Sequence, residues 1–178
     1  MSEESGSATE MERASDEESQ AKVLELARTA RMAMMATYDA DGTAHARPMV
    51  AVEYVAPEDG AALWFFTRDG SRKVDELERD PRVLLTYSDS AQDAWVSIEG
   101  RALVVRDTAL AKELWKEPLR TWFPEGPDDP ELAMIKVVPE AAEYWDTPSG
   151  ALVYAYGYLK AAITGKAPDP GEVKHVEM

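Results

Sequence analysis

The spacing of apolar residues changes about 30 positions into this 178-residue chain. Between residues 23 and 30 they recur every three or four positions, behind a Ser15-x-x-Glu18 capping box, which predicts a helix over 15–31. From Met32 onward they alternate or form short runs, bounded by turns rich in Gly, Pro and Asp, which is typical of strands. The predicted strands cover 32–38, 43–55, 61–67, 82–88, 93–105 and 132–138, and the last continues after Pro139 over 143–145.

Short helices are predicted between and after these strands. One covers residues 71–79, and another runs from an Asp107 cap to Glu117. A stretch rich in Ala, Tyr and Leu predicts a C-terminal helix over Ala151–Ile163, and Gly100 predicts a bulge or a bend in the fifth strand. About six strands in hairpin succession indicate a mainly β fold of the α+β class, a mostly antiparallel barrel with flanking helices.

The composition favours one globular domain, because 45% hydrophobic residues over 178 positions can bury a sizeable core. We expect one domain over 15–165, between a disordered acidic tail over 1–14 and a loose tail over 166–178. The absence of cysteine excludes disulfides and zinc–thiolate sites. Without a secretory signal or a long apolar run, a cytoplasmic protein with no membrane partner is expected. The net charge of −15 makes nucleic acid a poor partner.

The segment from Thr67 to Lys73 gathers groups that suit a phosphate monoester. It follows a strongly apolar strand and opens a short helix, whose first N–H groups attract anions. Ser71 can donate a hydrogen bond, Arg72 and Lys73 can pair with the charge, and Gly70 would let the backbone approach. An ordinary helix start with two solvated cations explains the same residues. Cations are disfavoured at a helix N-terminus, however, and a bound anion would remove that conflict.

A second candidate site is the strand that contains Arg47 and Pro48. A two-residue period puts His45, Arg47 and Met49 on one face, and Pro48 marks an edge or a bulge that could turn backbone groups toward a ligand. A barrel strand with an exposed arginine is the alternative. His45 has no neighbour at metal-ligand spacing, so no metal site is expected.

Tryptophan is abundant, and two of the five rings lie next to loops. Trp122 and Trp145 could close a site for a flat ligand, although core packing is the commoner role of a single tryptophan. No catalytic acid–base pair stands out among the 34 acids, and Asp75-Glu76 is interpreted as a solvated helix face. Catalytic residues therefore stay unknown, and a cofactor that brings its own chemistry fits better than acid–base hydrolysis.

Taken in order, three motifs resemble those of pyridoxamine 5′-phosphate oxidase-like proteins that bind FMN, in the general stress protein 26 branch. The resemblance covers roughly residues 18–165. Its motifs are Arg47-Pro48-Met49-Val50, then Phe66-Thr67 with Gly70-Ser71-Arg72-Lys73, followed by Asp80-Pro81-Arg82-Val83, and finally Glu143-Tyr144-Trp145-Asp146.

This resemblance implies a six-stranded antiparallel split β-barrel and a homodimer with non-covalent FMN at the subunit interface. Arg72 and Lys73 would hold the phosphate, assisted by Ser71 and Thr67. The other implied contacts are Arg47 at the polar end of the flavin, Pro48, Met49, Val50 and Phe66 beside it, and Trp122 and Trp145 from the second chain.

Two departures from the family pattern argue against oxidation of vitamin B6. Val52 stands where the true oxidases carry a substrate-binding lysine, and no Arg-x-His pair follows Trp145. The leading hypothesis is a stress-related flavin oxidoreductase that acts on an unidentified small substrate. A flavin carrier or sensor without turnover is one alternative, and a deazaflavin- or haem-binding relative is another.

Overall fold

The structure is a computed structural model that describes residues 3–52, 61–90, 94–146 and 172–178. In the described part, three α-helices accompany seven strands. In chain order they are α1 (Glu3–Ala30), β1 (Met32–Tyr38), β2 (Ala44–Val52), β3 (Leu63–Arg68), α2 (Arg72–Arg79), β4 (Arg82–Asp89), β5 (Ala94–Val105), α3 (Thr108–Leu114), the 3-10 helices η1 (Glu117–Thr121) and η2 (Gly126–Asp128), β6 (Leu132–Asp146) and β7 (Glu172–Glu177).

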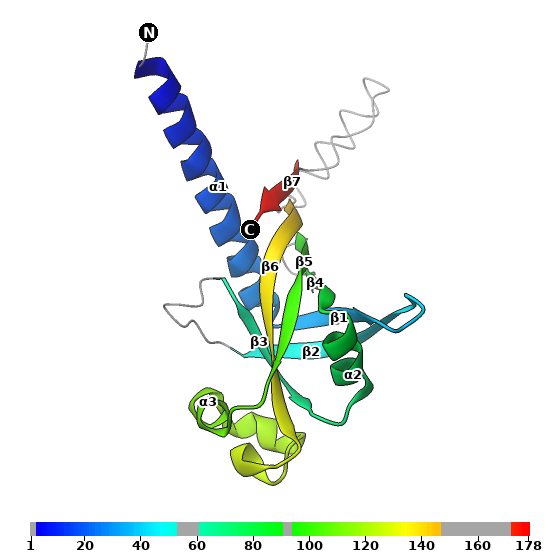
Figure 1. The fold of residues 1–178 in the computed structure, drawn as a ribbon. Coiled ribbons are helices and arrows are strands. Elements are labelled where there is room, and N and C mark those ends of the chain that lie inside the picture. The colour runs from blue at the N-terminus through cyan, green and yellow to red at the C-terminus, as the bar shows by residue number, and fades with distance from the viewer. Residues whose placement is uncertain (1–2, 53–60, 91–93, 147–171) are drawn as a thin grey trace, which may run out of the picture.

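Six antiparallel strands close into a barrel (Figure 1). Their order is β3-β2-β1-β4-β5-β6, and β6 pairs again with β3 to close the ring. β6 is 15 residues long. Its first half pairs with β3, and its second half pairs with β7. The predicted fold class, a six-stranded antiparallel split barrel with flanking helices, is confirmed.

The bulge predicted at Gly100 is confirmed where β5 pairs with β6. The register shifts between Glu99 and Gly100, and Gly100 lies opposite Pro139. A Cβ at Gly100 would come within 2.4 Å of the Val138 carbonyl oxygen, so this close approach requires glycine. Pro139 lacks the N–H that a regular ladder needs, and the irregularity accommodates it. β6 therefore runs without interruption through Pro139, whereas the sequence prediction left residues 139–142 out of the strand.

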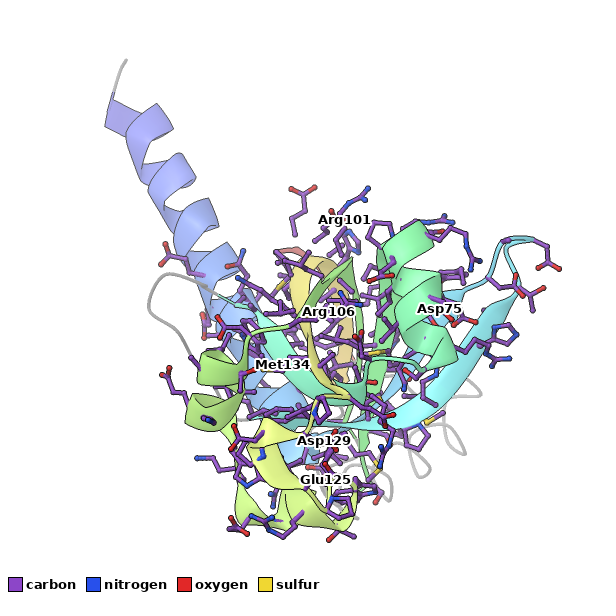
Figure 2. The ribbon with its side chains drawn as sticks, turned by 60° about the horizontal axis from the view of Figure 1, so that its bottom comes forward. Asp75, Arg101, Arg106, Glu125, Asp129 and Met134 are labelled. Atoms are coloured by element: carbon purple, nitrogen blue, oxygen red, sulfur yellow. The ribbon has the colours of Figure 1, made fainter. Side chains whose placement is uncertain are left out.

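Both faces of β3 are covered, which explains its unbroken apolar run. Leu63 and Phe65 belong to the cluster inside the barrel, and Trp64 and Phe66 belong to a second cluster outside it. The outer cluster is closed by the segment between β5 and β6, the part that Figure 2 brings forward with Glu125 and Asp129. That segment contributes the buried side chains of Ala111, Leu114 and Phe123.

The C-terminal half of α1 packs against the barrel, and its N-terminal half projects away from it (Figure 1). Val23, Leu26 and Ala27 are buried in the inner cluster, as the helical spacing predicted. The helix begins at Glu3 rather than at residue 15, so the structure continues it into the segment predicted to be a disordered tail.

Strand β7 shows that residues 172–177, part of the tail predicted to be loose over 166–178, form a paired strand. It pairs with the half of β6 that β3 leaves uncovered, and it buries Val176 in the inner cluster. The pairing of β7 depends on the free edge of β6, and the short polar sequence of β7 does not reveal that this edge exists. The predicted helix over 151–163 lies outside the described residues. α3 ends at Leu114 instead of Glu117, because the chain turns there into η1, which carries Pro118 in its first turn.

Candidate functional site

The end of β3 and the start of α2 form a corner centred on Lys73. Its ammonium donates a hydrogen bond to Thr67 Oγ1 at 2.9 Å and another to Ser71 Oγ at 3.1 Å. Ser71 is the N-cap residue of α2 but makes no side-chain capping hydrogen bond, so its hydroxyl does not occupy the N–H groups of the first helical turn. The corner thus presents a cation, two hydroxyls and helix N–H groups, which together suit an anion.

Positive charge is in excess at this corner. In the part of the chain that the structure describes, Lys73 forms no ion pair with a carboxylate. Burial lowers the pKa of Lys73, the neighbouring charge of Arg47 lowers it further, and Glu76 acts in the opposite direction. A bound dianion would offset both the burial and the repulsion.

Glu76, only 1% exposed, is the carboxylate that organises the surrounding groups. Thr37 donates to its Oε2, and Arg47 Nη2 lies 3.3 Å from the same oxygen. His45 Nδ1 lies 2.8 Å and Arg72 Nε 3.3 Å from Oε1. Burial by itself would raise the pKa of Glu76, but the hydrogen bonds from Thr37 and His45 and the charge of Arg47 bring it below its ordinary value of 4.5. The carboxylate is therefore ionised at neutral pH.

Arg47 is held inside this cluster. Its Nη1 donates to Thr37 Oγ1 at 2.6 Å and to the Met35 carbonyl at 3.3 Å, and the side chain is 19% exposed. Burial lowers the pKa of Arg47, and the nearby charge of Glu76 opposes that shift. Arg47, which lies on β2, thus connects this strand to β1 through Met35 and Thr37 and to α2 through Glu76. Its predicted contact with the polar end of a flavin stays a prediction.

A pocket of about 360 Å³ lies beside the Lys73 corner, within the size range of small-molecule sites. Its walls come from β2, β3, the start of α2 and the end of η1, and none of the described residues that line it is a histidine or a carboxylate. The candidates predicted from sequence that line it are Pro48, Met49, Val50, Phe66, Thr67, Ser71, Lys73 and Trp122.

The other three candidates lie outside this pocket. Arg47 and Arg72 bind Glu76, and Arg72 is 67% exposed. Trp145 lies opposite Trp95 in the pairing of β6 with β5, and both rings line a separate hollow of about 860 Å³. Met32 lines this hollow as well as the Lys73 pocket.

Sequence reasoning missed Glu76 and Thr37. Asp75 is exposed, as a solvated helix face requires, but the same interpretation is wrong for Glu76. The position of Glu76 beside the buried stripe of Val74 and Leu77 was the available signal. Thr37 gave no signal, because a threonine in a strand is ordinary.

The structure also bears on two further sequence arguments, the need for glycine at residue 70 and the surroundings of His45. A Cβ at Gly70 would meet no atom within 4 Å, so the corner does not require glycine there. His45 is engaged by Glu76, and the described residues contain no group of three side chains suited to a metal ion. The same residues include no helix with the length and apolar character of a membrane span.

A family model described as "Pyridoxamine 5′-phosphate oxidase like" matches residues 18–169. The chain belongs to this family. Within it, general stress protein 26 of Bacillus subtilis is 33% identical over 85 residues, which make up 46% of this chain and 60% of that protein. The chain spans about 60% of the length of the curated relatives it matches.

Solved structures of the pyridoxamine 5′-phosphate oxidase-like family share the barrel. A protein described as general stress protein 26 from Jannaschia sp. CCS1 has a TM-score of 0.71 over 90% of this chain and 99% of its own, at 22% identity, which shows the fold alone. The general stress FMN/FAD binding protein from Xanthomonas citri is 29% identical with a TM-score of 0.63, over 75% of this chain and 92% of its own.

Proposed function

We propose that this protein binds FMN without a covalent link and works as a flavin oxidoreductase on a small substrate. The observation that carries the proposal is the Lys73 ammonium, which lies between two hydroxyls at a helix start without a carboxylate partner among the described residues. A phosphate monoester would accept hydrogen bonds from Lys73, Ser71 and Thr67 and would balance the charge. The Xanthomonas citri relative, described as an FMN/FAD binding protein, supports the same ligand class.

The ring system of the flavin would lie against the apolar wall of the 360 Å³ pocket, which includes Met49, Val50, Phe66 and Trp122. A bound flavin would supply hydride and single-electron transfer. The residues of this chain would hold the phosphate, orient the ring and exclude water from it. The described lining residues include no carboxylate or histidine, the commonest acid–base groups, and this agrees with that division of roles.

A homodimer is the second part of the proposal. Met32, Met34 and Trp95 are large apolar side chains that are each more than 40% exposed, and they border the hollow that contains Trp145. Because Met32 also lines the Lys73 pocket, a second copy on this face would cover both hollows. Trp145 of one protomer would then reach the flavin bound by its partner. Sedimentation analysis should give a dimer, and a monomer that retains flavin would refute the shared site.

The phosphate assignment is tested by comparing FMN with riboflavin, which lacks the phosphate. Wild-type protein should bind FMN more tightly, and Lys73→Ala should remove most of that preference, because a charge-assisted hydrogen bond contributes about 1.5–3 kcal/mol. Arg79→Ala, at the exposed far end of α2, is the matched control and should keep the wild-type preference. An unchanged preference in Lys73→Ala would refute the assignment.

The oxidoreductase role is tested on the flavin-loaded protein. Bleaching of the oxidised-flavin absorbance by NADH or NADPH, followed by recovery in air, would support turnover. A flavin that neither reductant bleaches would favour the carrier or sensor instead. A purified protein with deazaflavin or haem absorbance would overturn the flavin proposal itself.

A further inference from the structure

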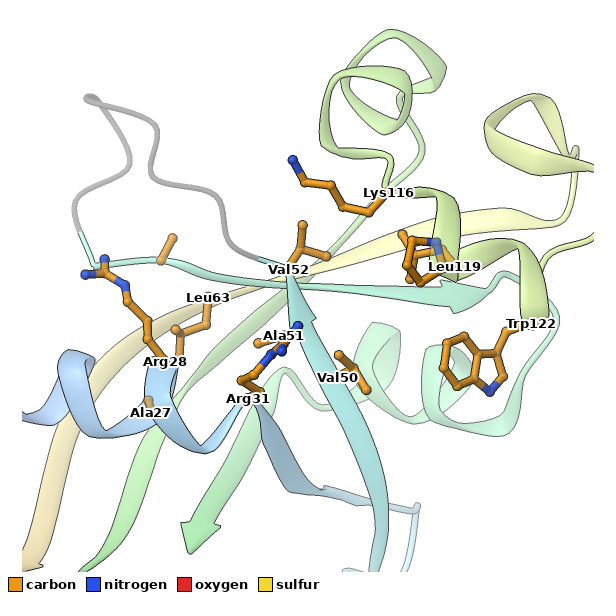
Figure 3. Close-up of a pocket in the computed structure, with 12 residues that line it drawn as sticks. Ala27, Arg28, Arg31, Val50, Ala51, Val52, Leu63, Lys116, Leu119 and Trp122 are labelled. Carbon is orange, nitrogen blue, oxygen red and sulfur yellow. The ribbon is translucent and has the colours of Figure 1, made fainter. Parts of the chain in front are cut away.

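A second pocket, of about 490 Å³, adjoins the Lys73 pocket, and Figure 3 shows the residues that line it. The two share Val50, Leu119 and Trp122 as lining residues, so a molecule in one lies next to a molecule in the other. The floor of the second pocket is apolar, with Val52 and Leu63 from β2 and β3.

Three cations surround this apolar floor. Arg28 and Arg31 approach from the end of α1, and Lys116 lies on the other side of the pocket, before η1 (Figure 3). None of the described lining residues is acidic. The concentration is unusual in a chain with 34 acids and 19 basic residues.

These three cations also differ from most of the other described arginines, because they form no ion pair with a described acidic residue. Ion pairs to acids hold Arg47, Arg68, Arg72, Arg82, Arg101, Arg106 and Arg120. Within the described ranges, Arg28, Arg31 and Lys116 form none. Among the described residues, therefore, no acid neutralises the charge that these three cations bring to the pocket.

The backbone fixes Arg31 at the edge of this pocket. Its φ of 59° lies in the left-handed region, which glycine adopts at lower cost than arginine. Its N–H donates to the Ala27 carbonyl at 3.2 Å, and its carbonyl accepts from the Ala51 N–H at 3.1 Å. The arginine is thus tied to α1 on one side and to β2 on the other, which orders the base of its side chain before any ligand arrives.

We infer that this second pocket binds an organic carboxylate with an apolar body and is the substrate site beside the flavin. The apolar floor would take the body, and Arg28, Arg31 and Lys116 would take the carboxylate. Only the role as a substrate site rests on the proposed flavin function. Anion binding follows from the pocket itself.

The probe for anion binding is naphthalene-2-carboxylate, compared by calorimetry with naphthalene-2-carboxamide, its uncharged counterpart. The wild-type protein should bind the carboxylate about tenfold more tightly or better, because only the anion pairs with the cations. Changing Arg28, Arg31 and Lys116 together to Gln should abolish the preference. The matched control changes Arg79, Arg101 and Lys112 to Gln, which removes the same amount of charge elsewhere on the surface. This control should retain the preference for the carboxylate over the carboxamide. Equal binding of the two probes, or a preference that survives the pocket variant, would overturn the inference.

Lys116→Gln alone guards against a triple variant that does not fold, because Lys116 lies exposed outside the barrel strands. It should weaken carboxylate binding about threefold and leave carboxamide binding unchanged. An unchanged affinity for the carboxylate in Lys116→Gln would count against the proposed role of Lys116 and against the proposed site.

The flavin separates failure of this inference from failure of the proposed function. Adding naphthalene-2-carboxylate to FMN-loaded protein should shift the flavin absorbance, because the two pockets share a wall, and the pocket variant should keep its FMN affinity. Cation-dependent binding without a spectral shift would overturn the substrate role alone. An FMN affinity that falls in the pocket variant but not in Lys73→Ala would instead overturn the proposed flavin site.

Discussion

Replacing Glu76 with Gln should destabilise the barrel more than any exposed charge change. The substitution keeps the shape of the side chain but removes its negative charge. That charge compensates Arg47, and the carboxylate oxygens also contact the Thr37 hydroxyl and the His45 ring. Taking one partner from a buried ion pair costs about 3–5 kcal/mol, because the other charge is left uncompensated. Arg47 is 19% exposed and Arg72 is 67% exposed, so water can take over part of the lost interaction. We therefore expect a loss near the lower bound, about 3 kcal/mol.

Urea and thermal unfolding measure this loss. In a domain of this size, 1 kcal/mol shifts Tm by about 2–4 °C, so Glu76→Gln should lower it by roughly 6–12 °C. Asp75→Asn is the matched control, since it removes an exposed carboxylate one residue earlier on the same helix. A free energy of unfolding for Glu76→Gln within about 0.5 kcal/mol of the control would refute the role assigned to Glu76.

The pH dependence has a definite sign. Because the pKa of Glu76 is lower in the folded protein than its ordinary value of 4.5, its contribution to stability is fully present above that value. The contribution is lost as the pH falls through the folded pKa. The difference in unfolding free energy between wild type and Glu76→Gln should therefore narrow as the pH falls below about 4.5. A difference that widens below pH 4.5 would contradict the reasoning.

Three further predictions follow from other parts of the structure. Asp107→Ala should cost about 1 kcal/mol in urea unfolding, because the carboxylate caps α3 through two backbone N–H groups, and Asp107→Asn should recover most of the loss. Gly100→Ala should cost about 1–3 kcal/mol or prevent folding, because its Cβ would strike the Val138 carbonyl, whereas Gly70→Ala should be nearly neutral. Arg72→Ala combined with Lys73→Ala should weaken FMN binding by several kcal/mol in a fluorescence titration, and wild-type affinity in the double variant would exclude the phosphate site.

Much of the barrel could be predicted because its local signals agree with its fold. β1 spans the predicted residues 32–38, and the glycine signal at Gly100 marks a real bulge. β7 was missed, since its pairing depends on how far β6 extends beyond β3, which is a tertiary property. Residues 139–142 were left out of the predicted strand because the sequence does not show that a bulge faces Pro139.

The candidate site was predictable where residues share one short segment. Thr67, Ser71 and Lys73 meet because a strand end and the following helix start bring them together. Glu76 was missed because burial of a charge depends on partners from other strands, Thr37 and His45, which lie more than 30 positions away in the chain. The second pocket likewise joins α1 to the segment before η1. The homodimer, the cytoplasmic location and the role of Trp145 stay predictions.

A crystal structure of the protein grown with FMN tests the central claim most directly, because it locates the phosphate. The account predicts phosphate oxygens within hydrogen-bond distance of Lys73 Nζ and Ser71 Oγ. The flavin ring should lie against Val50 of the same protomer, and Trp145 of a second copy should lie close to that ring. A phosphate bound among Arg28, Arg31 and Lys116, or a Lys73 corner filled by the protein's own side chains, would contradict it.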